Sequence, residues 1–261
     1  MNICKLALIL VVFSGLTGCK HSWWKAEDEQ HPFQGIPAKQ LYTEARAQLA
    51  KKEYSSAIKR LEALDTLYPF NDYAEPAELD LIYAYYKKED YALAAATADR
   101  CIHLYPRAKN IDYAYYMKGL AHFQQPRGAL ANMFPMDDSW RDPGTQSQAY
   151  SDFATFIQKF PESKYRANAA QRMIYLRNMF AQHELDVASY YFERKMYVAA
   201  VERAGFLIKT YPQAPSTEAA LSIIYWGNLA LGFVSTAQDA LTVYLATYHH
   251  NPKENVAVQE V

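Results

Sequence analysis

One spacing pattern recurs along this 261-residue chain and limits the folds that it can adopt. A tyrosine is followed three, seven and ten positions later by small or apolar residues, and then by a proline. The spacing of the first four residues places their side chains on one face of a helix. The three clearest copies are Tyr54-Ala57-Leu61-Leu64-Pro69, Tyr91-Ala94-Ala98-Cys101-Pro106 and Tyr197-Ala200-Ala204-Leu207-Pro212. A fourth copy keeps Ala149, Phe153, Phe156 and Pro161 with Gln146 in the tyrosine position, and a fifth keeps Ala237, Leu241 and Tyr244. Because proline cannot continue a helix, the pattern predicts helices of similar length, most of which end just before a proline.

This pattern resembles the second helix of a tetratricopeptide repeat, a unit of ~34 residues built from two antiparallel helices. Candidate first helices with helical apolar spacing lie at residues 41–49, 78–87, 112–123 and 217–231. The chain has 9 glycines, so we expect few turns that need positive φ and no architecture of many hairpins. The resemblance implies an all-α tetratricopeptide-repeat solenoid of about five repeats, or ten helices, in a right-handed superhelix, and such solenoids present binding surfaces.

The repeats are unevenly spaced. Their prolines fall at Pro69, Pro106, Pro161 and Pro212, and only the first interval is close to one repeat. The extra residues between Pro106 and Pro161 lie at 124–146, a stretch with three prolines and two glycines. This stretch is predicted to be a functional or disordered loop. The second stretch of extra residues, 163–194, contains no glycine or proline and predicts one long helix, or two with a kink, with Ser163 as N-cap.

The N-terminus is typical of a processed segment. Residues 1–18 have an apolar run too short to span a bilayer, and Leu16-Thr17-Gly18-Cys19 resembles the bacterial lipobox. That resemblance implies an N-acyl diacylglycerol lipid on Cys19, and a chance cysteine after an ordinary signal is the alternative. Lys20, where an Asp often retains lipoproteins at the inner membrane, favours the periplasmic face of the outer membrane.

The predicted organisation follows from these segments. It comprises a signal peptide (1–18), a lipidated tether (19–37), a repeat domain (38–250) and a polar tail (251–261). Within the repeat domain, the loop at 124–146 separates an N-terminal half (38–123) from a C-terminal half (147–250). Once Cys4 leaves with the signal and Cys19 is acylated, Cys101 remains alone, so no intramolecular disulfide can form.

Several functions are disfavoured by the sequence. A formal net charge of -1 argues against nucleic-acid binding. We found no phosphate loop, dinucleotide-binding glycine run, zinc-type Cys/His cluster or catalytic Ser-His-Asp order. We therefore expect no enzyme activity, no catalytic residues, no metal site and no cofactor beyond the lipid.

Beyond the generic repeat, segments spread from the lipobox to about residue 245 resemble the BamD family of outer-membrane β-barrel assembly lipoproteins. They are Leu67-Tyr68-Pro69-Phe70 with Tyr73, Leu79 to Lys87, Asn110 to Leu120, Arg141-Asp142-Pro143, Phe160-Pro161 with Ser163 and Tyr165, Arg172-Met173, Tyr190-Tyr191 and Tyr197 to Arg203. The resemblance implies a non-enzymatic scaffold, lipid-anchored in the outer membrane, that works with other lipoproteins of the assembly (BAM) complex. Its N-terminal half would recognise C-terminal targeting signals of unfolded outer-membrane proteins, and its C-terminal half would dock on the periplasmic POTRA region of the insertase BamA.

The same resemblance assigns Tyr73 to signal recognition and Arg203 to docking on BamA. We expect Tyr68 and Phe70 to join Tyr73 in a groove with Tyr83, Tyr85 and Tyr86, where rings and hydroxyls would meet an extended aromatic-rich strand. Packing between helices is the alternative role for each tyrosine.

Four charged residues and the family itself leave alternatives open. Arg203 could instead be a solvated arginine or pair with a neighbouring Glu. Asp137, Asp138 and Arg141 of the loop could form a partner surface or only pin the loop. The competing function is a pilotin-like or peptidoglycan-associated tetratricopeptide lipoprotein adaptor.

Overall fold

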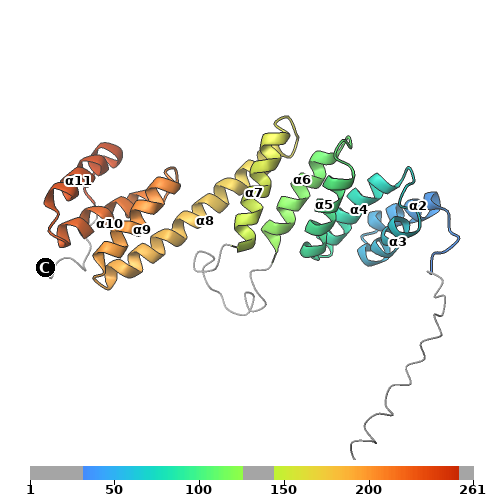
Figure 1. Ribbon diagram of the computed structural model, residues 1–261, viewed down its shortest axis with the longest axis horizontal. Coiled ribbons are helices and arrows are strands. Elements are labelled where there is room, and N and C mark those ends of the chain that lie inside the picture. The colour runs from blue at the N-terminus through green and yellow to red at the C-terminus, as the bar shows by residue number, and fades with distance from the viewer. Residues whose placement is uncertain (1–31, 126–143, 253–261) are drawn as a thin grey trace, which may run out of the picture. The chain divides into compact units, whose positions relative to one another are not determined.

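The computed structural model describes residues 32–125 and 144–252 (Figure 1). By internal contacts the chain divides into Met1–Ile36 and Pro37–Val261, and every described helix belongs to the second unit. The described ranges contain ten helices and no strand, which confirms the all-α prediction. The helices are α2 (Ala38–Ala50), α3 (Tyr54–Leu67), α4 (Ala74–Lys87), α5 (Tyr91–Leu104), α6 (Ile111–Gln124), α7 (Gly144–Lys159), α8 (Arg166–Glu193), α9 (Tyr197–Thr210), α10 (Thr217–Ala230) and α11 (Val234–Tyr248).

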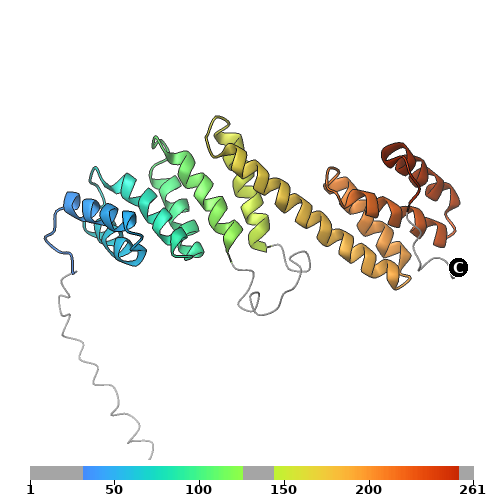
Figure 2. The ribbon, with the colours of Figure 1, turned by 180° about the vertical axis from the view of Figure 1, so that it is seen from behind.

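The helices pack in sequence order, each against the next (Figures 1 and 2). Contacts also join first helices of neighbouring repeats, α2 with α4, α4 with α6, and α8 with α10. The alanine that recurs at the same position in each second helix is fully buried every time, at Ala57, Ala94, Ala149, Ala200 and Ala237. A methyl group at this position lets the neighbouring helix approach closely, so the repeated alanine is a packing residue in all five pairs.

A common turn connects the two helices of four repeats. A residue with positive φ precedes the N-cap of the second helix, at Lys52, Glu89, Lys195 and Gly232. The next residue donates its backbone N–H to the carbonyl five positions earlier, for example Glu53 to Gln48 at 2.9 Å. This is the bonding of a Schellman helix end, where glycine is usual. Three of these four turns use Lys or Glu instead, so the low glycine content was a poor guide to the number of such turns.

The predicted long helix is confirmed, but its predicted N-cap is wrong. The 28 residues of α8 form one continuous helix, and Tyr165 is its N-cap, without a side-chain capping bond. Ser163 lies two residues earlier, where its hydroxyl donates to Asp112 Oδ2 at 2.6 Å and accepts from the Tyr165 N–H at 3.3 Å. Its side chain therefore ties the α7–α8 connection to α6. The helix α6 ends at Gln124, and most of the predicted loop lies outside the described residues.

One helix, α8, contributes to two separate hydrophobic clusters. Its first part places Ala169 and Leu176 in a cluster with residues of α4 to α7. Its later part places Ala181, Ala188 and Phe192 in a cluster with residues of α9 and α10. The extra length of α8 therefore connects the packing of the N-terminal repeats to that of the C-terminal repeats.

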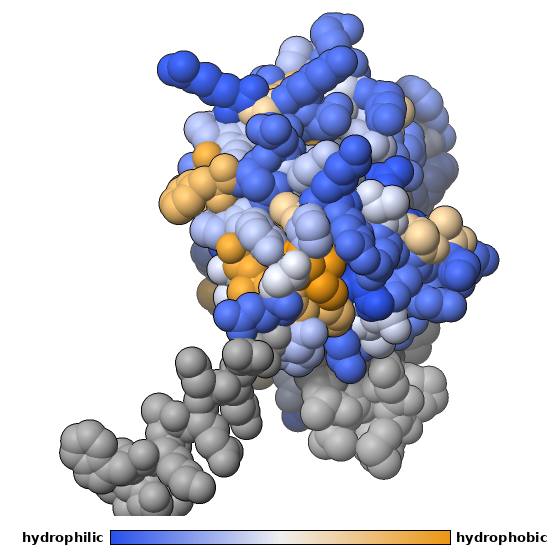
Figure 3. Space-filling view, turned by 90° about the vertical axis from the view of Figure 1, so that its right-hand side faces the viewer, coloured by the Kyte–Doolittle hydropathy of each residue, from blue (hydrophilic) through white to orange (hydrophobic). Residues whose placement is uncertain are grey.

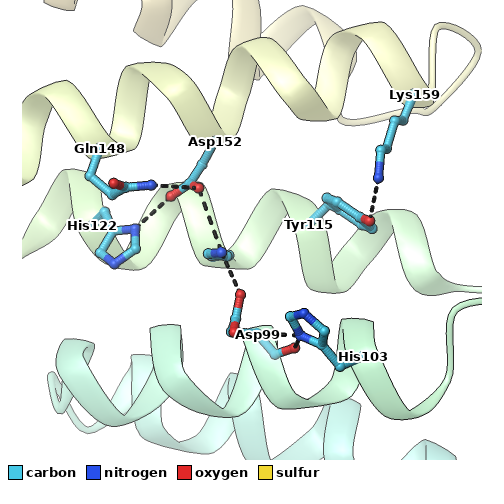
Figure 4. Close-up of polar contacts among 8 residues, drawn as sticks. Asp99, His103, Tyr115, His122, Gln148, Asp152 and Lys159 are labelled. Atoms are coloured by element: carbon cyan, nitrogen blue, oxygen red, sulfur yellow. Dashed lines mark hydrogen bonds and ion pairs between the residues drawn. The ribbon is translucent and has the colours of Figure 1, made fainter.

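A polar network supplements this packing between α5, α6 and α7 (Figure 4). Lys118 of α6 lies 2.5 Å from Asp99 Oδ1 of α5 and 3.8 Å from Asp152 Oδ1 of α7. His122 of α6 and Gln148 of α7 also bind Asp152, at 2.5 and 3.2 Å. The hydrogen bond from Lys118 holds the pKa of Asp99 below its usual range. Asp152 is buried, so its three partners balance the cost of removing its carboxylate from water.

Glu78 is a second buried carboxylate, and it has fewer polar partners than Asp152 to offset the cost of its burial. The Glu78 side chain of α4 is 2% exposed, and Arg100 Nη2 lies 2.7 Å from its Oε1. The same guanidinium also binds Asp65 of α3 at 2.7 Å, so two carboxylates share one arginine. Arg100 Nη2 is the partner of Oε1, whereas Oε2 has no hydrogen-bond partner within the described residues. Burial raises the pKa of Glu78 to about 7 despite the opposing attraction of Arg100.

This carboxylate makes stability depend on pH. Between pH 4.5 and about 7, folded Glu78 keeps a proton that the unfolded chain has released, so stability falls as pH rises. We expect this group to lower the free energy of unfolding by on the order of 2 kcal/mol over that range. Urea unfolding at several pH values should show that Glu78→Gln loses this fall, whereas Glu75→Gln, a half-exposed neighbour, keeps it. An equal fall in Glu78→Gln and the wild type would contradict the assignment.

Candidate functional site

A groove of about 970 Å³ runs along the first helices of the N-terminal repeats. Side chains from α2, α4 and α6 line it, together with the connections that precede α6 and α8. Four tyrosines contribute rings, namely Tyr42, Tyr83, Tyr113 and Tyr165. Its charged residues are Arg46, Lys109, Lys159, Lys164, Asp80, Asp112 and Glu162. Rings and charges of both signs therefore share one open surface.

An ion pair between neighbouring repeats forms part of this groove. Arg46 Nη1 of α2 donates to both oxygens of Asp80 of α4, at 3.1 and 3.2 Å. The Asp80 side chain is 16% exposed and the Arg46 side chain 59% exposed. Burial raises the pKa of Asp80, and Arg46 opposes that shift. Burial, and then Asp80, raises the pKa of Tyr42 as well, so its hydroxyl stays protonated and able to donate.

Ring contacts fix two of the tyrosines that line the groove, Tyr113 and Tyr165. The Tyr165 ring lies 4.6 Å from the Tyr116 ring, with only 8° between their planes, and 5.7 Å from the Tyr113 ring. Tyr116 is fixed in turn because its hydroxyl donates to Asn168 Oδ1 at 2.8 Å. Burial raises the pKa of Tyr113. These contacts hold Tyr113 and Tyr165 in position, so the aromatic surface is formed before any ligand arrives.

The three residues predicted to bind targeting signals lie on the α3–α4 connection. Tyr68 is the half-buried C-cap of α3, and Tyr73 is the N-cap of α4. Phe70 is fully exposed at 100%. The Asn71 side chain holds this connection, since its amide donates to the Tyr68 carbonyl and its oxygen accepts from the Tyr73 N–H at 2.7 Å. The end of the molecule at α2 and α3 is otherwise mostly hydrophilic (Figure 3), as a terminal repeat requires.

Of these three residues, only Tyr73 contacts a residue that lines the groove. The Tyr73 ring lies 5.3 Å from the ring of Tyr42, which lines the groove, whereas Tyr68 and Phe70 do not line it. Tyr83 lines the groove as expected. Tyr85 is buried and donates its hydroxyl to Glu62, and Tyr86 packs against the core and the Tyr91 ring. Tyr85 and Tyr86 are therefore packing residues, the alternative that the sequence left open.

Arg203 forms a second candidate site in the C-terminal repeats. Its Nη1 lies 3.0 Å from Glu184 Oε2, so α9 is joined to α8 by an ion pair. The Arg203 side chain is 48% exposed, whereas that of Glu184 is 14% exposed. Glu184 also contributes to raising the pKa of Tyr211, after burial. Arg203 is therefore a partly exposed cation held by a largely covered carboxylate.

An aromatic hollow of about 350 Å³ lies beside Arg203. It is lined by Tyr191, Ala199, Glu202, Arg203 and Phe206, and Phe206 is 47% exposed. Arginine and aromatic side chains are the residues that most often dominate binding energy at protein interfaces. The surroundings of Arg203 thus suit a protein partner better than a small ligand.

The sequence missed the residues that complete the groove, namely Tyr42, Arg46, Asp80, Tyr113 and Tyr165. A usable signal existed, because Arg46 and Asp80 are 34 residues apart, which is one repeat length. Ser216 and Gln182, also 34 apart, and Arg100 and Asp65, 35 apart, form hydrogen bonds in the same way. Polar pairs at one repeat period therefore identify contacts between adjacent repeats.

Other predicted residues lie outside the described ranges. These are Cys19, Asp137, Asp138 and Arg141. Within the described residues, Cys101 is buried and free, and burial raises its pKa to about 12. In the part of the chain that the structure describes, no group of three or more His, Cys, Asp or Glu could hold a metal ion. A search of the same residues finds no helix with the length and apolar character of a membrane span.

Comparison with known proteins gives consistent matches. A family model described as YfiO, outer membrane lipoprotein, matches residues 34–243. The outer membrane protein assembly factor BamD of Vibrio cholerae is 39% identical over 214 residues, which cover 82% of this chain and 86% of that protein. BamD of Xylella fastidiosa (strain Temecula1) is 36% identical over 238 residues, 91% of this chain and 80% of that protein.

A further relative agrees with these matches. BamD of Neisseria meningitidis serogroup A is 33% identical over 248 residues, 95% of this chain and 92% of that protein. A solved tetratricopeptide repeat protein from Parabacteroides merdae has a TM-score of 0.37 at 11% identity, over 85% of this chain and 82% of that chain, and is too distant to support an inference. The family model and the three relatives show that this chain belongs to the BamD (YfiO) family of outer membrane lipoproteins.

Proposed function

We propose that the protein is a non-enzymatic scaffold subunit of the machinery that assembles β-barrel proteins in the outer membrane. Relatives named outer membrane protein assembly factor support this role. In this proposal a lipid on Cys19 anchors the chain to the periplasmic face of the outer membrane. The N-terminal repeats bind targeting signals of unfolded outer-membrane proteins, while the C-terminal repeats dock on the POTRA region of BamA beside other lipoproteins of the complex.

The groove is the observation that carries the first half of the proposal. An unfolded barrel strand is extended, rich in aromatic side chains and has unpaired backbone groups. The four tyrosine rings of the groove offer stacking surfaces, and their hydroxyls can bind backbone groups. Fixed rings lose little conformational freedom on binding, so weak contacts can add up to useful affinity.

The separation of the two candidate sites supports the second half of the proposal, that the C-terminal repeats dock on BamA. The groove belongs to the cluster formed by α4 to α8, whereas Arg203 lies on α9, which belongs to the cluster formed by α8 to α10. A client in the groove and a protein at Arg203 would therefore touch different helices. That arrangement suits an adaptor that holds a client and an insertase together.

Aromatic truncation in and around the groove tests client binding. The variants Tyr83→Ala and Tyr73→Ala should each weaken binding of a fluorescent peptide that copies a C-terminal barrel strand by about five- to tenfold, because each removes one ring contact of ~1 kcal/mol. Anisotropy titration of the purified lipoprotein in detergent measures this. The control is Tyr190→Ala on α8, an exposed tyrosine outside the groove. Equal weakening by all three variants, or by none, would contradict the assignment of the groove.

A further inference from the structure

A second hollow, of about 390 Å³, is lined by residues of α7, α8 and α9 and by the residue that follows α9. Three of its side chains are aromatic. The ring of Phe180 on α8 lies 6.2 Å from the Tyr150 ring of α7 and 6.4 Å from the ring of Tyr211, the C-cap of α9. The other lining residues are polar or charged, namely Ser147, Arg177, His183, Glu184 and Thr210. We call this surface the Arg177 hollow, and the aromatic hollow described above the Arg203 hollow.

The two hollows are adjacent on one surface of α8 and α9. On α8, Arg177, Glu184 and Tyr191 follow one another at intervals of seven residues, which places them on one helix face over about 21 Å. The first two line the Arg177 hollow, whereas Tyr191 lines the Arg203 hollow. The ion pair between Glu184 and Arg203, at 3.0 Å, therefore joins a lining residue of one hollow to a lining residue of the other.

Arg177 is a cation that neutral groups hold in place. Its Nη1 donates to Gln213 Oε1 at 2.9 Å, while its Nε and Nη2 donate to Asn178 Oδ1 at 3.3 and 3.2 Å. Within the described ranges, this guanidinium forms no ion pair with a carboxylate. Its direction is thus fixed while its charge lacks a counter-ion, and a carboxylate would bind it more strongly than the amide oxygens do.

We propose that the partner that docks on Arg203 also fills the Arg177 hollow, placing a carboxylate on Arg177 and an apolar side chain between the three rings. This inference rests on the proposed docking of the POTRA region on the C-terminal repeats. The uncompensated charge of Arg177 and the continuity with the Arg203 hollow favour this occupant. The docking surface then spans α7, α8 and α9, and its partner presents acidic and apolar side chains on one face.

The extended surface stays clear of the groove proposed to bind the client. Ser147 and Tyr150, near the start of α7, line the Arg177 hollow, whereas Lys159, the last residue of α7, lines the groove. Tyr150 and Lys159 are nine residues apart, or about 13 Å along the helix. A partner in the hollow and a client in the groove can therefore bind at the same time.

Removal of the charge at position 177 in the full-length lipoprotein tests this surface. Arg177→Gln should weaken binding of the purified POTRA region about tenfold, because one charge-assisted contact is lost. The matched control, Arg166→Gln, removes an exposed arginine of α8 outside both hollows and should bind as the wild type does. Biolayer interferometry at two salt concentrations adds a readout that a purely structural role would not change. Added salt should weaken binding of Arg177→Gln less than binding of the wild type or the control.

Photocrosslinking from the α7 side of the hollow gives a second measurement that leaves Arg177 intact. Benzoylphenylalanine in place of Ser147 should crosslink to the POTRA region, whereas the same probe in place of Gln158, an exposed α7 residue outside the hollow, should not. If Arg177→Gln does not fold, this crosslink alone decides.

The outcomes separate this inference from the function on which it rests. Unchanged affinity of a folded Arg177→Gln, or no crosslink from position 147, would overturn the extended surface while docking at Arg203 stands. Failure of the wild type to bind the POTRA region would overturn the proposed docking and this inference together.

Discussion

Arg203→Glu is expected to reduce binding of the BamA periplasmic region by a hundredfold or more. The substitution removes a partly exposed guanidinium beside the aromatic hollow and reverses the charge presented to the partner. Losing a central arginine at an interface costs 2 kcal/mol or more, and a repulsive charge adds to that loss. Arg203→Lys should recover only part of the affinity, because an ammonium cannot make the same paired hydrogen bonds. Biolayer interferometry with the purified POTRA region measures both variants.

A charge swap separates docking from stability. Arg203→Glu alone leaves two carboxylates facing each other between α8 and α9, which itself destabilises the pair. The double variant Glu184→Arg/Arg203→Glu restores an ion pair of opposite orientation. We expect it to recover thermal stability but not BamA binding. Recovery of both would show that Arg203 acts only through the α8–α9 contact, and the docking assignment would be wrong.

Phe153→Ala is expected to cost about 3–5 kcal/mol of folding free energy. Phe153 of α7 is fully buried, and its ring lies against Gly119 of α6, where an added Cβ would come 2.7 Å from the ring. The Tyr116 and Phe123 rings surround it at 6.4 Å. Truncation would therefore leave a large cavity between α6 and α7. Urea unfolding of the lipoprotein in detergent measures the loss.

The contact with Gly119 offers a coupling test. Gly119→Ala alone should destabilise the protein because the new methyl group overlaps the Phe153 ring. In the double variant Gly119→Ala/Phe153→Leu, the smaller side chain makes room, so the combined loss should be less than the sum of the single losses. Strict additivity would mean that the two residues do not share this contact. Phe206→Ala, at an exposed site, is the control and should change stability little.

The fold followed from the sequence because each repeat carries its own local signal. The second helices are marked by buried alanines, an apolar stripe and a proline that ends the helix. These three features lie close together in the chain. The helix α3 ends at Leu67, and α5 ends at Leu104, each two residues before its proline. The first helices have weaker signals, since their faces are shared between packing and the groove.

The site followed only in part, because it is built between repeats. Tyr83 and Tyr85 are two residues apart on α4, yet one lines the groove and the other is buried against α3 through Glu62. Tyrosine content alone cannot separate these roles, because the choice depends on which neighbouring helix covers each ring. The error at Ser163 has the same origin, since its hydroxyl binds Asp112 of another repeat instead of capping its own helix.

The proposed adaptor uses two sites at the same time in one molecule. The most direct test mixes the purified lipoprotein with the barrel-strand peptide and the POTRA region, and follows complex mass and peptide fluorescence together by analytical ultracentrifugation. We expect one ternary complex, with each ligand binding as tightly in the presence of the other as alone. Tyr83→Ala should lose only the peptide, and Arg203→Glu only the POTRA region. Mutually exclusive binding, or loss of both ligands from either variant, would contradict the two-site adaptor.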